Sequence, residues 1–204
     1  MQITSASITG GKVIFESILD EVPGGLSLPV ATLDNLKVDA TLSVDKRWLK
    51  AGAPVYVDIA ARTATLCKSA LGIIGGDSTH PRVSKDNHFA VGEFLNDGAN
   101  TGLISAIDVT NAGYDIITVN TALLFAAATK FGQGSVTGGN TTLAFTPNGL
   151  TKDDVYIADG NADVAVVTMG TVRADALTYP INALYAIALR GGAAGTGTSL
   201  ITLV

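Results

Sequence analysis

The chain has 204 residues, which is enough for one sizeable hydrophobic core or two small ones. Only 15% of the residues are charged and 47% are hydrophobic, a composition typical of an oligomer or a shell component whose apolar surface is covered. The net charge of −5 argues against a nucleic-acid-binding protein, because such a protein presents a basic patch to the phosphates.

Cys67 is the single cysteine, so packing rather than an intramolecular disulfide must hold the fold. This agrees with assembly in a reducing cytoplasm, although disulfide-free secreted proteins are also common. The first residues do not combine a basic segment with an apolar run, and we expect no signal peptide. The nearest approach to a membrane span, residues 116–128, is interrupted by Thr118, Asn120 and Thr121, and we expect none.

Residues 1–40 alternate short apolar runs with glycine and proline, and two interpretations remain open. Pro23 and Pro29 bias the residues before them to extended backbone, which favours an extended N-terminal arm. The alternative is a first strand pair of the core, which would include residues 12–20.

Residues 55–59 alternate Val55, Val57 and Ile59 with polar or aromatic side chains, which indicates a half-buried strand. A turn and a second strand at 63–68 complete a predicted hairpin. Residues 70–87 are rich in turn signals and are predicted to form a loop.

The stretch from His88 to Phe131 is predicted to form an antiparallel β-meander at the centre of an all-β protein. Two turn clusters, at 96–100 and 111–113, divide it into apolar runs. Residues 123–129 are ambiguous, because their alanines favour a helix while their length fits a strand.

The predicted fold is all-β, built as a meander, small barrel or sandwich. A β-rich domain is expected over 41–204, in which residues 95–150 could protrude as a lobe. One short helix is predicted at 181–189, with Thr178 as its cap and Pro180 in its first turn, and residues 199–204 are predicted to form a closing strand.

The two histidines, His80 and His88, lie near Asp77 and Asp86, and the four side chains could ligate a metal. No third histidine or thiol is close in sequence, and carboxylates beside turns are ordinarily solvated. We therefore predict no metal site and no cofactor.

Signatures of catalysis are missing from the sequence. Cys67 lies between Leu66 and Lys68 in a predicted strand, where a buried thiol is usually inert. No nucleophile elbow or zinc-protease motif is present, and the glycine-rich segments 132–138 and 191–197 lack a phosphate-binding lysine. We predict no catalytic residues and no enzymatic activity.

Charge is distributed unevenly along the chain. Residues 46–85 are mainly basic, whereas residues 86–129 hold five acids and no base. Two solvated faces would explain this pattern. A sharper hypothesis is that unlike patches of neighbouring subunits meet.

Several short segments carry a resemblance to a known class of proteins. Residues 49–58 read LKAGAPVYVD, an Ala-Gly-x-Pro-Val entry to a strand. The segment FAVGEF at 89–94 leads to ISAIDV at 104–109 and YDIITV at 114–119, and TVRADALTYP at 171–180 precedes the predicted helix. In this pattern, which spans residues 45–204, the chain resembles tailed-bacteriophage head decoration and head-fibre proteins.

The resemblance implies a virion structural protein on the capsid surface, assembled in the cytoplasm of a bacterial host. It implies a homo-oligomer, expected as a trimer, that binds the major capsid protein and stabilises or decorates the head. Residues 1–40 would serve as the capsid anchor. We expect neither nucleic acid nor a membrane as a partner.

Two alternatives remain for the function. A receptor- or carbohydrate-binding virion module would need an exposed aromatic platform, but aromatic residues make up only 6% of the chain and Trp48 stands alone beside basic residues. An enzyme would have to place its site near His80 and His88.

Overall fold

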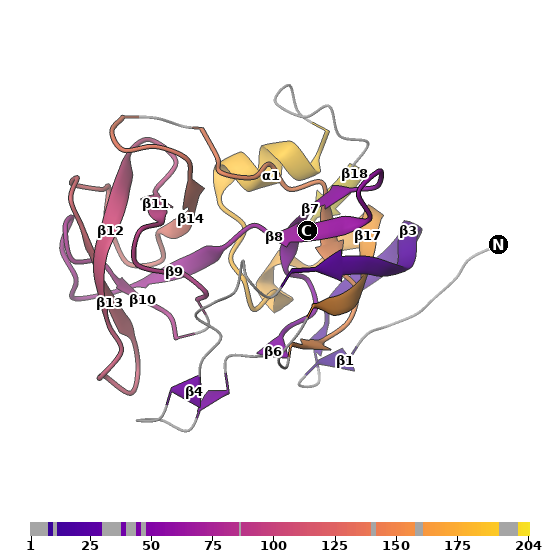
Figure 1. Cartoon of the computed structure of the whole chain (residues 1–204), viewed down its shortest axis with the longest axis horizontal. Coiled ribbons are helices and arrows are strands. Elements are labelled where there is room, and N and C mark those ends of the chain that lie inside the picture. Colours follow the sequence, from indigo (N-terminus) through magenta and orange to yellow (C-terminus); the bar gives the residue numbers. More distant parts are fainter. Residues whose placement is uncertain are drawn as a thin grey trace.

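The computed structural model describes residues 8–9, 12–29, 38–39, 44–45, 48–85, 87–139, 142–157, 161–191 and 200–204. In these residues the protein is mostly β-strand with one α-helix, which confirms the predicted all-β fold with a short helix near the C-terminus (Figure 1). The elements in chain order are β1 (Ile8–Thr9), β2 (Lys12–Val13), β3 (Phe15–Leu28), β4 (Val38–Asp39), β5 (Val44–Asp45), β6 (Trp48–Leu49), β7 (Pro54–Asp58), β8 (Thr63–Leu66), β9 (Ser69–Ile73), β10 (Arg82–Val83), β11 (Phe94–Asn96), β12 (Thr101–Asp108), β13 (Asp115–Val119), β14 (Lys130–Gly134), β15 (Gly149–Thr151), β16 (Val155–Tyr156), β17 (Ala162–Val172), the 3₁₀ turn η2 (Ala174–Ala176), α1 (Ala183–Leu189) and β18 (Leu200–Leu203).

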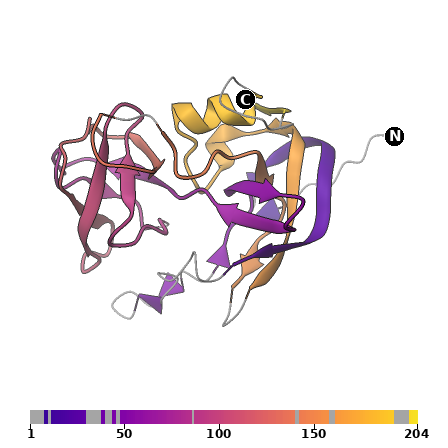
Figure 2. The same cartoon turned by 45° about the horizontal axis from the view of Figure 1, so that its top comes forward.

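The barrel lobe, residues 69–134, is one of two lobes visible in Figures 1 and 2. Its six strands close in the order β10-β13-β12-β11-β14-β9, and all neighbours are antiparallel. Strands β11, β12 and β13 form the predicted meander within this ring. Closure removes the free sheet edges that an open meander would expose.

The sheet lobe contains β3, β7, β8, β15, β17 and β18, and α1 lies against it. Strand β15 pairs with both β7 and β17, so the ladder β15-β7-β8-β3-β17 returns to its first strand. Strand β18 extends it beyond β17 and is parallel to it. The predicted closing strand is therefore confirmed in position.

The barrel lobe is an insertion in the sheet lobe. The chain passes from β8 to β9 through Cys67 and Lys68, and it returns between β14 and β15. The lobe therefore begins and ends earlier than the predicted 95–150, because residues 149–151 pair with sheet-lobe strands.

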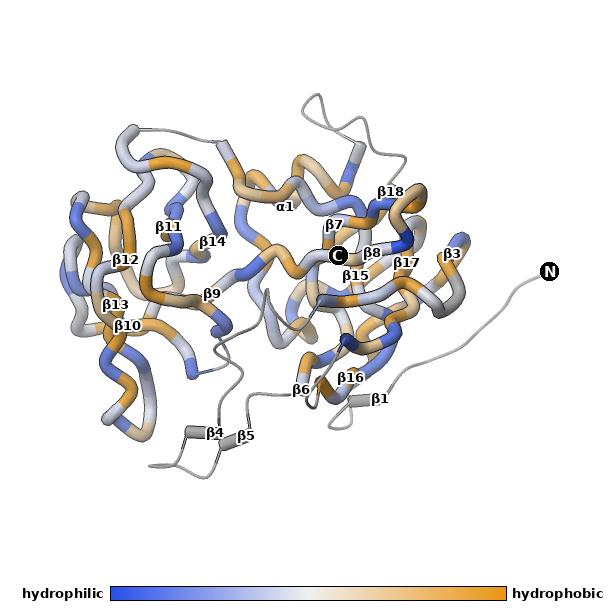
Figure 3. The backbone as a smooth tube through the Cα atoms, viewed as in Figure 1, coloured by the Kyte–Doolittle hydropathy of each residue, from blue (hydrophilic) through white to orange (hydrophobic). Residues whose placement is uncertain are grey.

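Alternation of side chains explains how both lobes fill their cores, and Figure 3 shows apolar and polar residues interspersed along the strands. In β7, Val55 and Val57 are buried while Tyr56 points outward, as the sequence predicts. The strand ends at Asp58, so the prediction that Ile59 continues the buried face is wrong, and Ile59 is exposed in the turn that follows. The barrel core includes Ile104, Ile117 and Phe131. Separate clusters of buried residues fill the sheet lobe.

The prediction of an extended arm over residues 1–40 is wrong for residues 15–28. They form β3, which pairs with β17 along most of its length, and Leu26 and Leu28 are buried. The register shifts where Pro23 occurs, and Gly25 adopts a φ of 86°. A bulge thus accommodates the proline, which lacks a ladder donor. Residues 1–7 lie outside the described residues.

Other predicted elements differ locally. Residues 70–87 are not a simple loop, because most of β9 and all of β10 lie within them. Residues 123–129 form neither a helix nor a strand. The helix is capped by Asn182, whose Oδ1 accepts a hydrogen bond from Tyr185 N–H at 2.8 Å, rather than by Thr178. No helix in the described part of the chain is long and apolar enough to cross a membrane.

Candidate functional site

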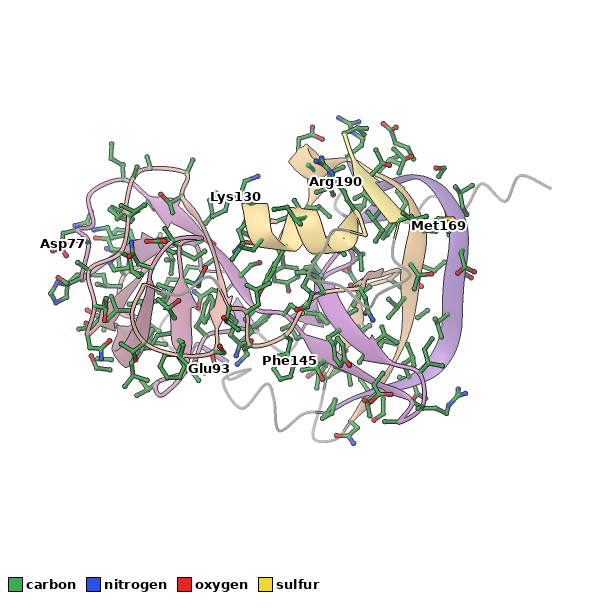
Figure 4. The ribbon with its side chains drawn as sticks, turned by 90° about the horizontal axis from the view of Figure 1, so that it is seen from above. Asp77, Glu93, Lys130, Phe145, Met169 and Arg190 are labelled. Atoms are coloured by element: carbon green, nitrogen blue, oxygen red, sulfur yellow. The ribbon has the colours of Figure 1, made fainter. Side chains whose placement is uncertain are left out.

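Asp77 and His80, two of the candidate metal ligands, form an exposed turn of the barrel lobe, and Figure 4 shows Asp77 at the end farthest from the sheet lobe. Asp77 Oδ1 accepts hydrogen bonds from the N–H groups of Thr79 at 2.8 Å and His80 at 2.7 Å. These bonds stabilise the ionised form and lower the pKa of Asp77 to about 2, and the bond from Thr79 has the largest effect. The carboxylate therefore acts as the acceptor that closes the turn.

His88 is buried and faces the sheet lobe instead. Its Nε2 lies 3.0 Å from the hydroxyl oxygen of Tyr179, which also accepts a hydrogen bond from Lys50 N–H at 3.2 Å. The fold thus gives the two histidines different surroundings. Asp86 lies outside the described residues, and among those described no three His, Cys, Asp or Glu side chains gather as a metal site.

Cys67 is buried directly after β8. Burial raises the pKa of its thiol well above the ordinary value. Because the thiolate is the reactive form, this environment disfavours nucleophilic chemistry.

An ion pair between a buried lysine and a partly exposed glutamate lies where the two lobes meet. Lys68 is 3% exposed, and its Nζ lies 2.5 Å from Glu93 Oε1. Glu93 also accepts hydrogen bonds from Ala90 N–H at 2.8 Å and from Gln133 Nε2 at 3.3 Å. These bonds hold the lysine, just before β9, against the turn that precedes β11.

Tyr185 of α1 joins the first connection between the lobes to β14 of the barrel lobe. Its hydroxyl donates to the carbonyl of Lys68 at 2.9 Å and accepts from Gln133 N–H at 3.0 Å. Burial raises the pKa of Tyr185 well above its ordinary value, so the phenol keeps the proton that it donates. Sequence patterns did not identify this junction, because its bonds join distant segments.

A second ion pair also joins a base of residues 46–85 to an acid of residues 86–129. Lys85 Nζ lies 2.7 Å from Asp115 Oδ1, and Asp115 is fully buried. This pair and Lys68–Glu93 each join the basic segment to the acidic segment within the chain. The hypothesis that unlike patches meet between subunits therefore does not apply to these four charges.

An aromatic pair is exposed on the short ladder of β6 and β16. Trp48 and Tyr156 are cross-strand partners whose ring centroids lie 4.9 Å apart, with the ring planes tilted by 53°. Trp48 is 43% exposed and Tyr156 is 39% exposed. The prediction that Trp48 stands alone is wrong, because its aromatic neighbour comes from a distant segment.

The barrel apolar patch, defined as Leu71, Ile74, Leu124 and residues 126–128, is a second exposed feature. Ile74 is 77% and Leu124 is 63% exposed. The 126–128 segment lies along β9, where Ala128 N–H donates to the carbonyl of Gly72 at 2.9 Å and Gly72 N–H donates to that of Thr129 at 2.7 Å. These bonds place the exposed alanines of 126–128 beside β9, the strand that carries Leu71 and precedes Ile74.

Comparisons with protein families, with curated proteins and with solved structures find no match to this chain. The barrel apolar patch and the Trp48–Tyr156 pair are thus the features from which a function can be inferred.

Proposed function

We propose that this protein is a virion structural protein that binds the outer surface of a tailed-phage capsid and stabilises or decorates the head. In this proposal it contacts the major capsid protein as a homo-oligomer, expected as a trimer. The observation that carries the proposal is the barrel apolar patch.

Burial of this patch would be favourable. Fully burying a leucine or isoleucine side chain contributes roughly 1.5–3 kcal/mol. Ile74 and Leu124 leave most of that contribution unrealised in the single chain, since both are more than half exposed. Ordering costs offset much of the gain in each contact, so an oligomer that repeats the contact around a symmetry axis would bind better than one copy.

The first test is whether the protein occurs in purified virions of the phage that carries its gene. Quantitative mass spectrometry is expected to find it at a copy number in a simple ratio to the major capsid protein. Its absence from virions would contradict the proposed function, whichever surface is involved.

The second test is the variant Ile74→Glu, which places a charge in the patch. We expect roughly a tenfold or greater loss of binding to decoration-free capsids, measured by co-sedimentation, because the carboxylate must be desolvated. Ile59→Glu is the matched control, since Ile59 is also an isoleucine in a turn after a strand, is 67% exposed and lies in the sheet lobe. Equal binding of Ile74→Glu and the control would exclude the patch as the capsid contact.

The role of an N-terminal capsid anchor is a separate prediction. It applies to the parts of residues 1–40 that flank β3, because β3 is a core strand. Removing residues 1–7 and repeating the co-sedimentation tests it. The absence of enzymatic activity likewise stays a prediction.

A further inference from the structure

The short ladder of β6 and β16 holds its two aromatic side chains outward. Leu49 pairs with Val155, and these two side chains pack against the sheet-lobe core. Trp48 pairs with Tyr156, and these two lie on the opposite face of the ladder. Leu49 is fully buried, so the ladder is anchored on one side while the rings stay exposed on the other.

Polar groups lie beside the rings in fixed positions. Lys50 Nζ lies 5.5 Å from the centre of the Trp48 ring and 3.2 Å from Asp154 Oδ2. Asp154 Oδ1 accepts a hydrogen bond from Ala51 N–H at 2.8 Å. The carboxylate thus holds the ammonium over the Trp48 ring, and the ammonium has further N–H groups with which it could reach a ligand.

The size of the aromatic surface favours a small ligand over a protein partner. An aromatic side chain offers about 150–250 Å², so two rings exposed by two-fifths offer roughly 120–200 Å². A stable protein interface needs ~800 Å² from each partner. The pair therefore fits one or two sugar rings much better than a protein surface.

The chemistry of the surface also fits a sugar. A pyranose ring presents C–H groups on its face, which pack on aromatic rings, and hydroxyls at its rim, which need donors and acceptors. Ligand sites typically combine apolar and aromatic walls with a few well-placed polar groups. Trp48 and Tyr156 supply the wall, and Lys50, which Asp154 holds in place, supplies hydrogen-bond donors.

We propose that Trp48 and Tyr156, with Lys50 and Asp154, form a carbohydrate-binding site. The site lies on the β6–β16 ladder, which packs against the core of the sheet lobe, whereas the barrel apolar patch lies in the barrel lobe. The proposed carbohydrate site is therefore separate from the proposed capsid contact and does not depend on that contact.

Trp48 is the single tryptophan of the chain, so its fluorescence reports on this site directly. The experiment screens the full-length protein on an array of bacterial surface polysaccharides together with cello-, chito- and malto-tetraose. Each glycan that binds is then titrated while tryptophan emission is recorded. The expected result is a saturable change in emission for at least one glycan. If no glycan on the array binds, or if a bound glycan leaves the emission unchanged, the proposal is overturned.

Tyr156→Ala is expected to weaken glycan binding by about tenfold, which corresponds to ~1.4 kcal/mol. The matched control is Tyr56→Ala, because Tyr56 is also 39% exposed but stacks on Phe145 instead of Trp48. If Tyr156→Ala lowers the melting temperature, Tyr156→Thr replaces it, since threonine keeps a strand preference. Equal weakening by the Tyr56 and Tyr156 variants would contradict the site.

Virion binding by the Tyr156 variant separates this inference from the proposed function. We expect its co-sedimentation with capsids to be unchanged. If the variant loses capsid binding, the aromatic pair is a capsid contact and the carbohydrate site is excluded, while the structural function stands.

Discussion

Lys68 is the residue on which the junction between the lobes depends most directly. It is almost completely buried, so its charge requires Glu93. Removing one partner of a buried pair leaves an uncompensated charge, whereas replacing both with apolar groups is often nearly neutral.

We therefore expect Glu93→Ala to lower the free energy of unfolding by about 1.5–3 kcal/mol in urea denaturation, because Glu93 is partly exposed. The double variant Lys68→Met/Glu93→Leu should recover most of this loss, because no buried charge remains. A Glu93→Ala variant within 1 kcal/mol of the unmodified protein would show that water reaches the lysine.

Tyr185→Phe tests the hydroxyl that joins Lys68 to Gln133 of β14. The variant leaves Gln133 N–H and the Lys68 carbonyl without this buried partner, and we expect a loss of about 1–3 kcal/mol. Tyr114→Phe is a suitable control, because Tyr114 contacts Arg82 through its ring. Equal stability of the two variants would contradict the bridging role.

Asp77 provides a prediction about pH. Hydrogen bonds from the backbone N–H groups of Thr79 and His80 lower its pKa in the folded protein to about 2, below the ordinary value of 3.8, so folding favours the ionised form. The resulting stabilisation is complete above the unfolded pKa and is lost as the pH falls through the folded value. An NMR titration of the side-chain carboxyl should give a midpoint near pH 2. Asp77→Asn should keep the turn, since the amide oxygen of asparagine can accept the same hydrogen bonds. A midpoint near pH 3.8 in the unmodified protein would contradict the hydrogen bonds to the Asp77 carboxylate.

At the scale of elements, β3 decides how the N-terminal region behaves. Pro23, Pro29 and the paired glycines favour an extended arm in local terms, but Phe15, Leu26 and Leu28 are buried on folding. The bulge lets the strand continue although proline has no N–H to donate to the ladder. Burial of the apolar side chains therefore decides that this segment joins the core.

Deleting residues 1–40 should consequently prevent the sheet lobe from folding, since β17 loses its partner along most of its length. Loss of native chemical-shift dispersion in the NMR spectrum is the expected outcome, and deletion of residues 1–7 is the control. A folded 41–204 fragment would show that the remaining strands close without β3.

At the scale of the whole molecule, the barrel lobe is inserted into the sheet lobe. This insertion explains why the barrel apolar patch and the Trp48–Tyr156 pair lie on different lobes. The first chain connection is held by Lys68, Glu93 and Tyr185, so the lobes meet through specific bonds. The barrel apolar patch belongs to one lobe and the Trp48–Tyr156 pair to the other. The two proposed binding activities can therefore be removed separately by surface substitutions.

The sequence alone determined the features that depend on neighbouring residues. Alternation in β7, the turn clusters of the meander and the apolar run of α1 act locally, so they identified an all-β chain with one short helix. Closure of the barrel, the pairing of Lys68 with Glu93 and the inclusion of β3 in the core depend on contacts between distant segments. The same is true of the candidate carbohydrate site. Trp48 seemed isolated in the sequence, and only the pairing of β6 with β16 places Tyr156 beside it, because strand partners are chosen by tertiary packing and not by local pattern.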